Sequence, residues 1–421
     1  MLNIRIIYIC CLILTFASCK MKDEITCYGG SDSDLVQLLE KEGYTLKFYP
    51  SVSEALQNAP EKSGVLLLSD SYPVKGTSIS QEDESLIEAK SLRVLVEFPQ
   101  RIGTTDSSKS DTLNLERIVV CDSINTELPF MSLLSFNRCI LKETSDSINH
   151  PILVAAKVAG FDKAVYGLKD TETRPVLYYR TPHLLVSTTC ISHFASDRYM
   201  PEQKIKSLYE YIFRWLLSKN TVTFSSWITY ITPSYTPSDV LPENAGYESI
   251  KKGIEWFYNG HFLVNSEWKQ NWVDKYMGDG TMPIGPSIPD QFQNGDGSLG
   301  VLEGHMSEIR YDGSQLYRYW MRADVQGEAS YAFAAAGDLL ENNEYSKVAT
   351  NLIDYSFKEY RDSERNDPAS PSYGLLGWAY THKGTYYRDD NARFLLGVID
   401  SSAFLNDTEW DKKIAEAIIE N

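Results

Sequence analysis

The run GVLLLSD occupies residues 64–70 and is the clearest secondary-structure signal in the first half of the chain. Val65 to Leu68 are apolar without a break, and the polar residues Ser69 and Asp70 follow at once. A strand that is covered on both faces has such an unbroken apolar run, whereas a half-exposed strand alternates apolar and polar residues. The run therefore predicts a strand inside a parallel sheet.

Strand-like and helix-like segments alternate on both sides of this run, from residue 27 to residue 220. The expected strands cover residues 26–28, 46–49, 92–97, 117–121, 152–158, 176–179 and 184–188. The expected helices cover residues 32–42, 53–58, 81–90 and 201–218. Strands that alternate with helices form a sheet with helices packed on its faces. The pattern predicts an α/β sandwich over residues 27–220.

Three phrases in this region resemble the class I glutamine-amidotransferase-like fold, in the ThuA-like form that accompanies some bacterial sugar-degrading proteins. They are VLLLSDSYP at residues 65–73, VAGFDKAVYGL at residues 158–168 and STTCISHFASDRYMP at residues 187–201. The resemblance implies a parallel-sheet sandwich whose nucleophile is a cysteine on a strained strand-to-helix turn between glycines. Cys121 lies in VVCDS and Cys190 lies in TTCIS, without flanking glycines. We therefore expect a scaffold or a binding domain here rather than a catalytic one.

The second half of the chain is helical in pattern. Residues 221–245 combine β-branched residues and prolines without a helical period, and we expect an extended linker there. Over residues 246–421 the expected helices cover residues 247–263, 266–276, 314–341, 344–364, 390–404 and 408–420. Long helices joined by aromatic, glycine-rich loops resemble the (α/α) toroid of six-hairpin glycosidases. A closed toroid needs more hairpins, so an open half-ring and a truncated copy of a longer enzyme stay as alternatives.

Residues 296–337 join a glycine-rich loop to the longest of these helices and carry several charged residues. No basic residue lies three or four places from Asp324 or Glu328, so the usual ion pair between successive helical turns cannot occupy them. Four residues are about one helical turn, which predicts that both carboxylates share one face. We expect two unpaired carboxylates at a functional site. The alternative is the solvated half of an amphipathic helix.

Two further phrases, RADVQGEA at residues 322–329 and YYRDDNARFLLGVI at residues 386–399, resemble segments of Bacteroidetes glycosidase-like toroid proteins. The resemblance implies acidic residues at loop ends and helix starts that face a sugar-binding cavity. The candidate catalytic residues are Glu303, Asp324, Glu328, Asp389 and Asp390. The candidate substrate-binding residues are Arg322, His305, Trp320 and Arg393, with Trp256, Tyr311, Trp378 and Tyr386 as further ring platforms.

Hydrolysis of a glycosidic bond generally needs two carboxyls, one as acid and one as base or nucleophile. We expect Glu328 or Glu303 to be the acid, because apolar surroundings raise the pKa of a carboxyl. Asp389 or Asp324 is then the base, and the resemblance to toroidal glycosidases implies an inverting mechanism. Capping of the helix that follows is an alternative role for Asp389 or Asp390.

We expect no metal and no cofactor. A calcium loop starting at Asp290 would have Phe292 at its third position and Val301 at its twelfth, where the motif requires oxygen ligands. The cysteines that follow the N-terminal segment are widely spaced and have no clustered histidines, which argues against zinc. They are Cys27, Cys121, Cys139 and Cys190. Buried free thiols are the preferred interpretation, and two disulfides are the alternative.

Composition limits the partners of the chain. Its 421 residues suffice for two or three domains, and its formal net charge of −17 argues against nucleic acid as a partner. Aromatic residues make up 12% of the chain, and rings combined with carboxylates suit a neutral polyhydroxylated ligand such as an oligo- or polysaccharide.

Residues 1–19 have the pattern of an export signal. Arg5 precedes an apolar run, and the small residues Ala17 and Ser18 stand directly before Cys19, as in a bacterial lipobox. This pattern predicts a lipid anchor on Cys19 and a place at the bacterial outer membrane, on its periplasmic or cell-surface side.

These observations lead to three functional hypotheses. The first is an envelope lipoprotein of the glycoside-hydrolase type that acts on a glycan. The second is a non-catalytic glycan-binding lipoprotein or an inactive remnant of such an enzyme. The third is a structural envelope protein that uses the α/β domain for protein contacts.

Overall fold

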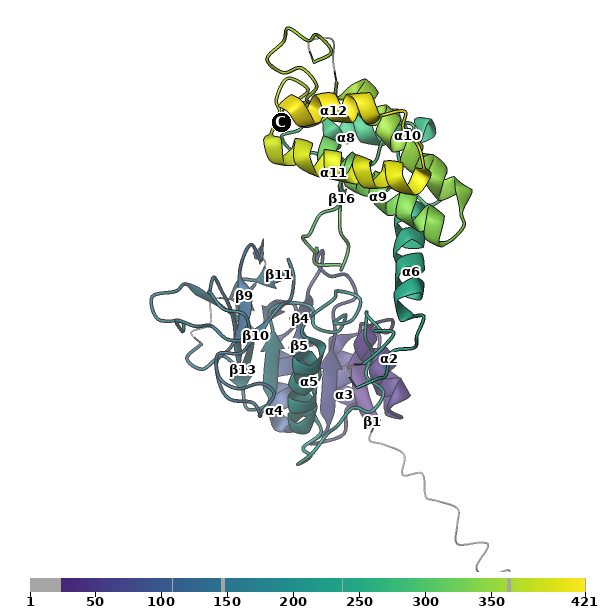
Figure 1. Cartoon of the computed structure of the whole chain (residues 1–421). Helices are drawn as coiled ribbons and strands as arrows, with labels where there is room; N and C mark the ends of the chain where they lie inside the picture. The colour runs from purple at the N-terminus through teal and green to yellow at the C-terminus, as the bar shows by residue number, and fades with distance from the viewer. Residues whose placement is uncertain (1–23, 108, 145–147, 237, 362–364, 421) are drawn as a thin grey trace, which may run out of the picture. The chain divides into compact units, whose positions relative to one another are not determined.

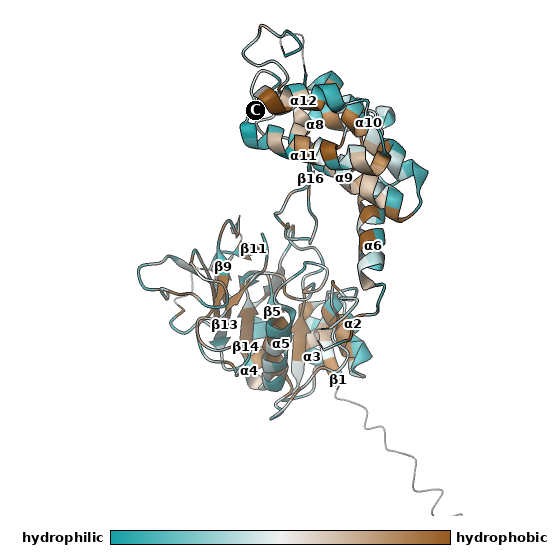
Figure 2. Ribbon diagram, in the orientation of Figure 1, coloured by the Kyte–Doolittle hydropathy of each residue, from teal (hydrophilic) through white to brown (hydrophobic). Residues whose placement is uncertain are grey.

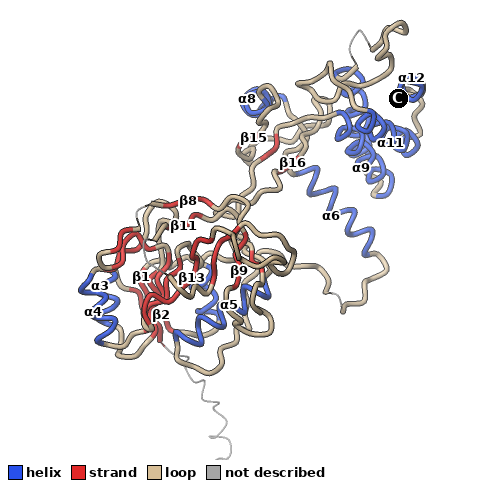
Figure 3. The backbone as a smooth tube through the Cα atoms, turned by 90° about the vertical axis from the view of Figure 1, so that its left-hand side faces the viewer, coloured by secondary structure: helices blue, strands red, loops and turns tan. Residues whose placement is uncertain are grey.

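The computed structural model describes residues 24–107, 109–144, 148–236, 238–361 and 365–420. The expected export signal and Cys19 lie outside these residues. The chain divides into two compact units (Figures 1 and 3). Unit 1 consists of Met1–Thr232 and Ile309–Ser314, and unit 2 consists of Pro233–Glu308 and Gln315–Asn421. None of the described helices is both long enough and apolar enough to cross a membrane.

Unit 1 is built on a nine-stranded sheet of order β10-β9-β12-β13-β14-β5-β3-β1-β2. One half is parallel and contains β2 (Thr45–Phe48), β1 (Glu24–Tyr28), β3 (Gly64–Leu67), β5 (Arg93–Glu97) and β14 (Leu184–Ser187). The other half is antiparallel and contains β13 (Thr173–Thr181), β12 (Leu153–Ala156), β9 (Arg117–Val120) and β10 (Leu133–Leu134). The predicted α/β class is confirmed for this unit.

Helices cover both faces of the sheet, as the unbroken apolar run predicted. Leu66 packs in a core cluster with α2 (Asp34–Lys41) and α5 (Glu202–Leu216), whereas Val65 and Leu67 pack in another cluster with α3 (Val52–Asn58) and α4 (Gln81–Ala89). Figure 3 shows α5 and the α3–α4 pair on different sides of the strands. The central strands are hydrophobic over most of their length (Figure 2).

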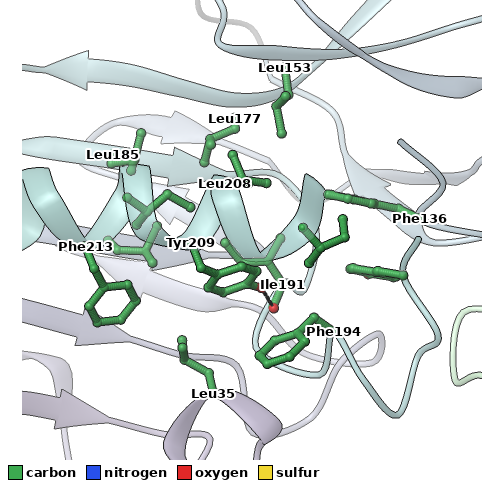
Figure 4. Packing of buried hydrophobic residues seen from close by; sticks show 14 of the residues in the cluster. Leu35, Phe136, Leu153, Leu177, Leu185, Ile191, Phe194, Leu208, Tyr209 and Phe213 are labelled. Atoms are coloured by element: carbon green, nitrogen blue, oxygen red, sulfur yellow. Dashed lines mark hydrogen bonds between the residues drawn. The ribbon is translucent and has the colours of Figure 1, made fainter. Parts of the chain in front are cut away.

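The larger core cluster of unit 1 is closed by aromatic residues from α5 and from the segment after β14 (Figure 4). Phe194 lies 4.8 Å from Tyr209 between ring centroids. The buried Tyr209 hydroxyl donates a hydrogen bond to the carbonyl of Ile191. This bond removes the cost of burying an unpaired hydroxyl among apolar side chains.

Six short strands of unit 1 were not predicted. One is β10 of the main sheet. The others are β4 (Thr77–Ile79), β6 (Pro99–Ile102), β7 (Thr105–Asp106), β8 (Ser110–Thr112) and β11 (Ile140–Lys142), which form two small sheets of order β4-β6-β7 and β11-β8. Each of these strands has two to four residues, and most of the residues in the two small sheets are polar. So short a segment offers no alternation that could be recognised in the sequence.

Unit 2 is mainly helical. Its helices are α6 (Ala245–Asn259), α7 (Ser266–Trp268), η1 (Lys269–Asp274), α8 (Lys275–Met277), α9 (Ala323–Leu339), α10 (Asn343–Glu359), α11 (Arg388–Leu405) and α12 (Asp411–Glu420). The helix expected over residues 314–341 starts only at Ala323, because Tyr317–Arg318 forms β17 between β15 (Ile284–Gly285) and β16 (Gly304–His305). The helix expected over residues 266–276 is divided into α7, a π-helical turn and α8.

Helices α9 and α11 lie side by side and run in the same direction. Near their starts, the Arg322 guanidinium lies between Asp324 of α9 and Asp390 of α11. Further along both helices, the hydroxyl oxygens of Ser330 and Ser401 lie 3.1 Å apart. Both N-termini therefore lie at the same end of the pair. Small residues permit this close approach, as in helix packing generally.

We expect Gly397→Ala to destabilise unit 2 by about 1–3 kcal/mol, the usual cost of overpacking. A Cβ atom at Gly397 would lie 2.2 Å from the carbonyl oxygen of Gly327, so α9 and α11 would have to separate. Urea unfolding with a unit 2 fluorescence signal measures the effect. The matched control is Gly253→Ala on α6, where a Cβ meets no atom within 4 Å. This control should be neutral or slightly stabilising, since alanine favours a helix. Equal stabilities of the two variants would contradict the expected contact.

Candidate functional site

Three carboxylates and two arginines of unit 2 form a connected charge network at the starts of α9 and α11. Arg322 lies at its centre. Its Nη2 atom is 3.0 Å from Oε1 of Glu303 and 3.4 Å from Oδ2 of Asp324, and its Nη1 atom is 3.5 Å from Oδ1 of Asp390. Arg318 forms a second ion pair with Glu303. The structure therefore brings together candidates from three separate parts of the sequence.

Two buried amide side chains fix the segments that carry these groups. Gln326 of α9 accepts from the backbone N–H of Val301 and donates to its carbonyl, both at 2.8 Å. Asn391 of α11 accepts from the backbone N–H of Leu376 at 2.7 Å and donates to its carbonyl at 3.0 Å. Each amide thus holds a loop against a helix start by a paired hydrogen bond. Sequence reasoning missed both, although amides inside apolar helical phrases were a visible signal.

Burial makes the two aspartates unequal partners in a proton equilibrium. Asp324 is 1% exposed and Asp390 is 6% exposed. The pKa of Asp390 is raised to about 6, first by burial and then by the charge of Asp324 and a hydrogen bond with its carboxyl, against the opposing effect of Arg322. Two carboxyls that are close together cannot both ionise freely. The pair therefore shares a proton at mildly acidic pH.

Several polar atoms of this region are buried without a hydrogen-bond partner in the described part of the chain. They include Oδ1 of Asp324, Nε of Arg322 and Nε1 of Trp320. Buried polar atoms are usually paired, so a group of unpaired ones from one short segment needs a reason. A polar ligand atom or a water molecule that binds them would satisfy both donors and the acceptor.

Aromatic rings lie next to the charge network. The rings of Trp320 and Trp378 meet edge to face with centroids 5.1 Å apart, and Trp378 meets Tyr387 at 5.2 Å. The Arg318 guanidinium lies 5.0 Å from the Trp320 ring. Both tryptophans are half-buried, whereas Tyr387 is exposed. These rings offer flat apolar faces beside charged groups.

Several predicted site residues lie outside the network. Glu328 and Asp389 are exposed. We expected Asp324 and Glu328 to share one environment, and this expectation is wrong. Of these two carboxylates, only Asp324 contacts Arg322 and lies near the start of α11. His305 is exposed on β16 and packs against Tyr317, with centroids 4.6 Å apart. Arg393 reaches Asp324 only at 3.9 Å and is 58% exposed.

Two expectations about the carboxylates need correction. Asp324 is not unpaired, because Arg322 lies two residues before it, at the N-cap of α9, where the chain is not yet helical. The helix spacing rule therefore did not apply to this pair. Asp389 and Asp390 do not cap α11, because the N-cap is Tyr387. Both aspartates lie in the first helical turn, where a carboxylate still interacts favourably with the helix dipole.

None of the cysteines described in unit 1 has the features of a reactive nucleophile. None has the positive φ of a strained turn. Cys190 is fully buried, and burial raises the pKa of its thiol. All four described cysteines are free thiols, which is the interpretation that we preferred over two disulfides. Three of them are buried, and Cys121 is half-buried.

A fully buried carboxylate, Glu97, organises the ends of β3, β5 and β14 in unit 1. It accepts hydrogen bonds from the backbone N–H groups of Ser69, Ile191 and Ser192 at 2.9–3.0 Å, and from the Ser192 hydroxyl at 2.7 Å. Because every one of these donors is buried and cannot reach water, the Glu97 carboxylate serves as the hydrogen-bond acceptor for all of them.

We expect Glu97→Ala to destabilise unit 1 by about 3 kcal/mol, because it leaves several buried donors without an acceptor. Glu97→Gln keeps one acceptor oxygen and should cost less. Thermal unfolding of the two variants compares them directly. If Glu97→Ala is as stable as the wild type, the carboxylate is not needed to satisfy these donors.

No protein-family model, no curated protein and no solved structure matches the chain. Among the described residues, no group of three or more histidines, cysteines, aspartates or glutamates is arranged to hold a metal ion. The functional argument therefore rests on the chemistry of the unit 2 network.

Proposed function

We propose that unit 2 carries a carbohydrate site of the glycoside-hydrolase type, within an envelope lipoprotein anchored through Cys19. The observation that carries this proposal is the pairing of Asp324 and Asp390 through Arg322. The site contains a carboxyl whose pKa is raised to about 6, a value suited to proton donation, next to a second carboxyl. Cleavage of a glycosidic bond requires such an unequal pair.

In this proposal Asp390 donates a proton to the leaving glycosidic oxygen. Asp324 lies beside Arg322 and contacts Asp390, and its charge and its hydrogen bond help to raise the pKa of that acid. Glu303 contacts both Arg318 and Arg322 and orients Arg322 in this scheme. These roles replace the sequence expectation of Glu328 or Glu303 as the acid. Inversion places the two catalytic carboxyls roughly 6.5–9.5 Å apart. An inverting mechanism would therefore need a base other than Asp324, which contacts Asp390.

The helix arrangement supports the toroid part of the proposal. In a ring of helical hairpins, each hairpin reverses the chain twice, so successive inner helices must run in the same direction. Helices α9 and α11 run this way, and α10 and α12 follow them as the outer members of two hairpins. The rings of Trp320, Trp378 and Tyr387 are suited to stack on sugar faces. Unit 1 would serve as a glutamine-amidotransferase-like scaffold.

A non-catalytic glycan-binding protein is the second candidate. The observation that favours it is that Glu303, Asp324 and Asp390 all form ion pairs with Arg322, so their carboxylates are already engaged within the protein. A binding site would use the same rings and charges without turnover.

A glycan panel separates the two candidates. The intact protein is incubated with neutral and acidic oligosaccharides, while reducing-end release measures cleavage and calorimetry measures binding. The proposal expects cleavage of at least one glycan by the wild type and by Glu328→Gln, whose exposed carboxylate lies outside the network. Binding without release would favour the second candidate. Neither binding nor release would refute both.

A further inference from the structure

We infer that unit 1 contains a second ligand site, a groove for an uncharged polyhydroxylated chain on the antiparallel half of the sheet. This inference goes beyond the proposed function, because no residue of the unit 2 network takes part. Its basis is a cavity of about 790 Å³, which lies in the range of ligand pockets. The groove is lined by separate parts of the sequence, including Ser123, Asn149, His150, Thr171, Tyr179 and Tyr211.

The lining is polar but almost without charge. Hydroxyl and amide groups come from Ser123, Asn149 and Thr171, and Asp122 is the one acidic or basic side chain among the described lining residues besides His150. Such groups both donate and accept hydrogen bonds, as the hydroxyls of a sugar do. Among the described lining residues, an anionic polymer finds no lysine or arginine to pair with. The chemistry therefore favours a neutral ligand.

Two tyrosines give the groove an aromatic wall. Tyr179 comes from β13 and Tyr211 from α5, and both are half-buried. The ring of Trp215 meets the ring of Tyr179 with centroids 5.2 Å apart and supports it from the side. A supported ring is a suitable surface for the apolar face of a sugar, because little side-chain entropy is lost on binding.

A neighbouring cavity extends the groove and indicates a chain rather than a single small molecule. It measures about 690 Å³ and shares Asn149, His150 and Tyr179 with the first. Its charged residues, Glu84 and Arg180, form an ion pair at 3.2 Å. The extension is thus also close to neutral. Two adjoining cavities with common residues suit consecutive sugar units of an oligosaccharide.

The test uses affinity electrophoresis of the full protein in gels that contain laminarin, xyloglucan, galactomannan or soluble starch, followed by calorimetry. The double variant Asn149→Ala/His150→Ala removes two exposed polar groups and should not disturb folding. We expect it to lower affinity for a bound polysaccharide by about tenfold or more, as loss of two hydrogen bonds would. Tyr166→Ala, at an exposed tyrosine outside the groove, is the matched control and should bind like the wild type.

The outcomes also separate this inference from the proposed function. If the double variant binds every polysaccharide like the wild type, the groove is refuted, whether or not the unit 2 site cleaves a glycan. If the double variant loses binding but keeps cleavage, the groove stands apart from the unit 2 site. In these gels, a bound polysaccharide slows the migration of the protein. If only the anionic polymers dextran sulfate or polygalacturonate slowed it, the neutral-ligand assignment would be refuted. No retardation by any polymer would refute the groove.

Discussion

Replacing Asp390 by Asn is expected to reduce glycan cleavage by about 10²–10⁴-fold, the usual contribution of a positioned general acid. The amide keeps the size of the side chain and can still contact Arg322, but it has no proton of suitable acidity to donate. For the wild type, turnover should fall as the pH rises through about 6, because burial and Asp324 raise the pKa of Asp390 to that value. Initial rates from pH 4 to pH 8 measure both effects.

Asp389→Asn is the matched control for this variant. Asp389 precedes Asp390 in the same helical turn but is exposed and outside the network. It should keep the rate of the wild type and move the pH profile only slightly to lower pH, because the Asp389 charge is the last of the causes that raise the pKa of Asp390. Equal loss in both variants would mean that the general charge of this helix start matters, and not the Asp390 carboxyl.

Asp197 of unit 1 is expected to produce the largest dependence of stability on pH. It is 6% exposed, and its pKa is raised to about 8 by burial first and then by the charges of Asp34, Glu97 and Asp312. Since the pKa of an unfolded aspartate is about 4, the folded state binds more protons between pH 4 and pH 8. The contribution of Asp197 is thus fully present below pH 4 and is lost as the pH rises towards 8, by up to about 1.4 kcal/mol per pH unit.

The variant Asp197→Asn should remove this dependence. It should unfold at a higher temperature than the wild type at pH 8, and the difference should become small at pH 4. The difference between the two unfolding curves isolates this group, because Asp390 is present in both proteins. Asp32→Asn, at an exposed position of unit 1, is the control and should follow the wild type. A lower unfolding temperature for Asp197→Asn at pH 8 would contradict the account.

Much of unit 1 could be predicted from the sequence, because each of its long central strands has an apolar run that can be recognised without knowledge of its neighbours. An unbroken apolar run such as residues 64–68 can be buried only between two layers of helices. The two-residue strand β10 and the polar strand β8 have no such signal, and their pairing depends on distant parts of the chain. Register and the antiparallel half of the sheet therefore needed the structure.

The candidate site was predictable in residue type but not in arrangement. The phrases around Asp324 and Asp390 identified the correct helices, yet helical periodicity placed Glu328 beside Asp324 and overlooked Arg322. The reason is that α9 starts later than its apolar pattern indicates, so Arg322 folds back from an extended residue. Which of two adjacent aspartates is buried depends on the packing of α11, which the sequence of Asp389 and Asp390 does not reveal.

The shared proton of Asp324 and Asp390 can be measured without knowledge of the substrate. Isotope-labelled aspartate allows each carboxyl to be titrated by carbon NMR in the wild type, Asp390→Asn and Asp389→Asn. The account predicts a carboxyl that titrates near pH 6 in the wild type and in Asp389→Asn and that is missing in Asp390→Asn. If the wild type and Asp390→Asn give the same titration between pH 5 and pH 7, the two aspartates do not share a proton, and the proposed acid is contradicted.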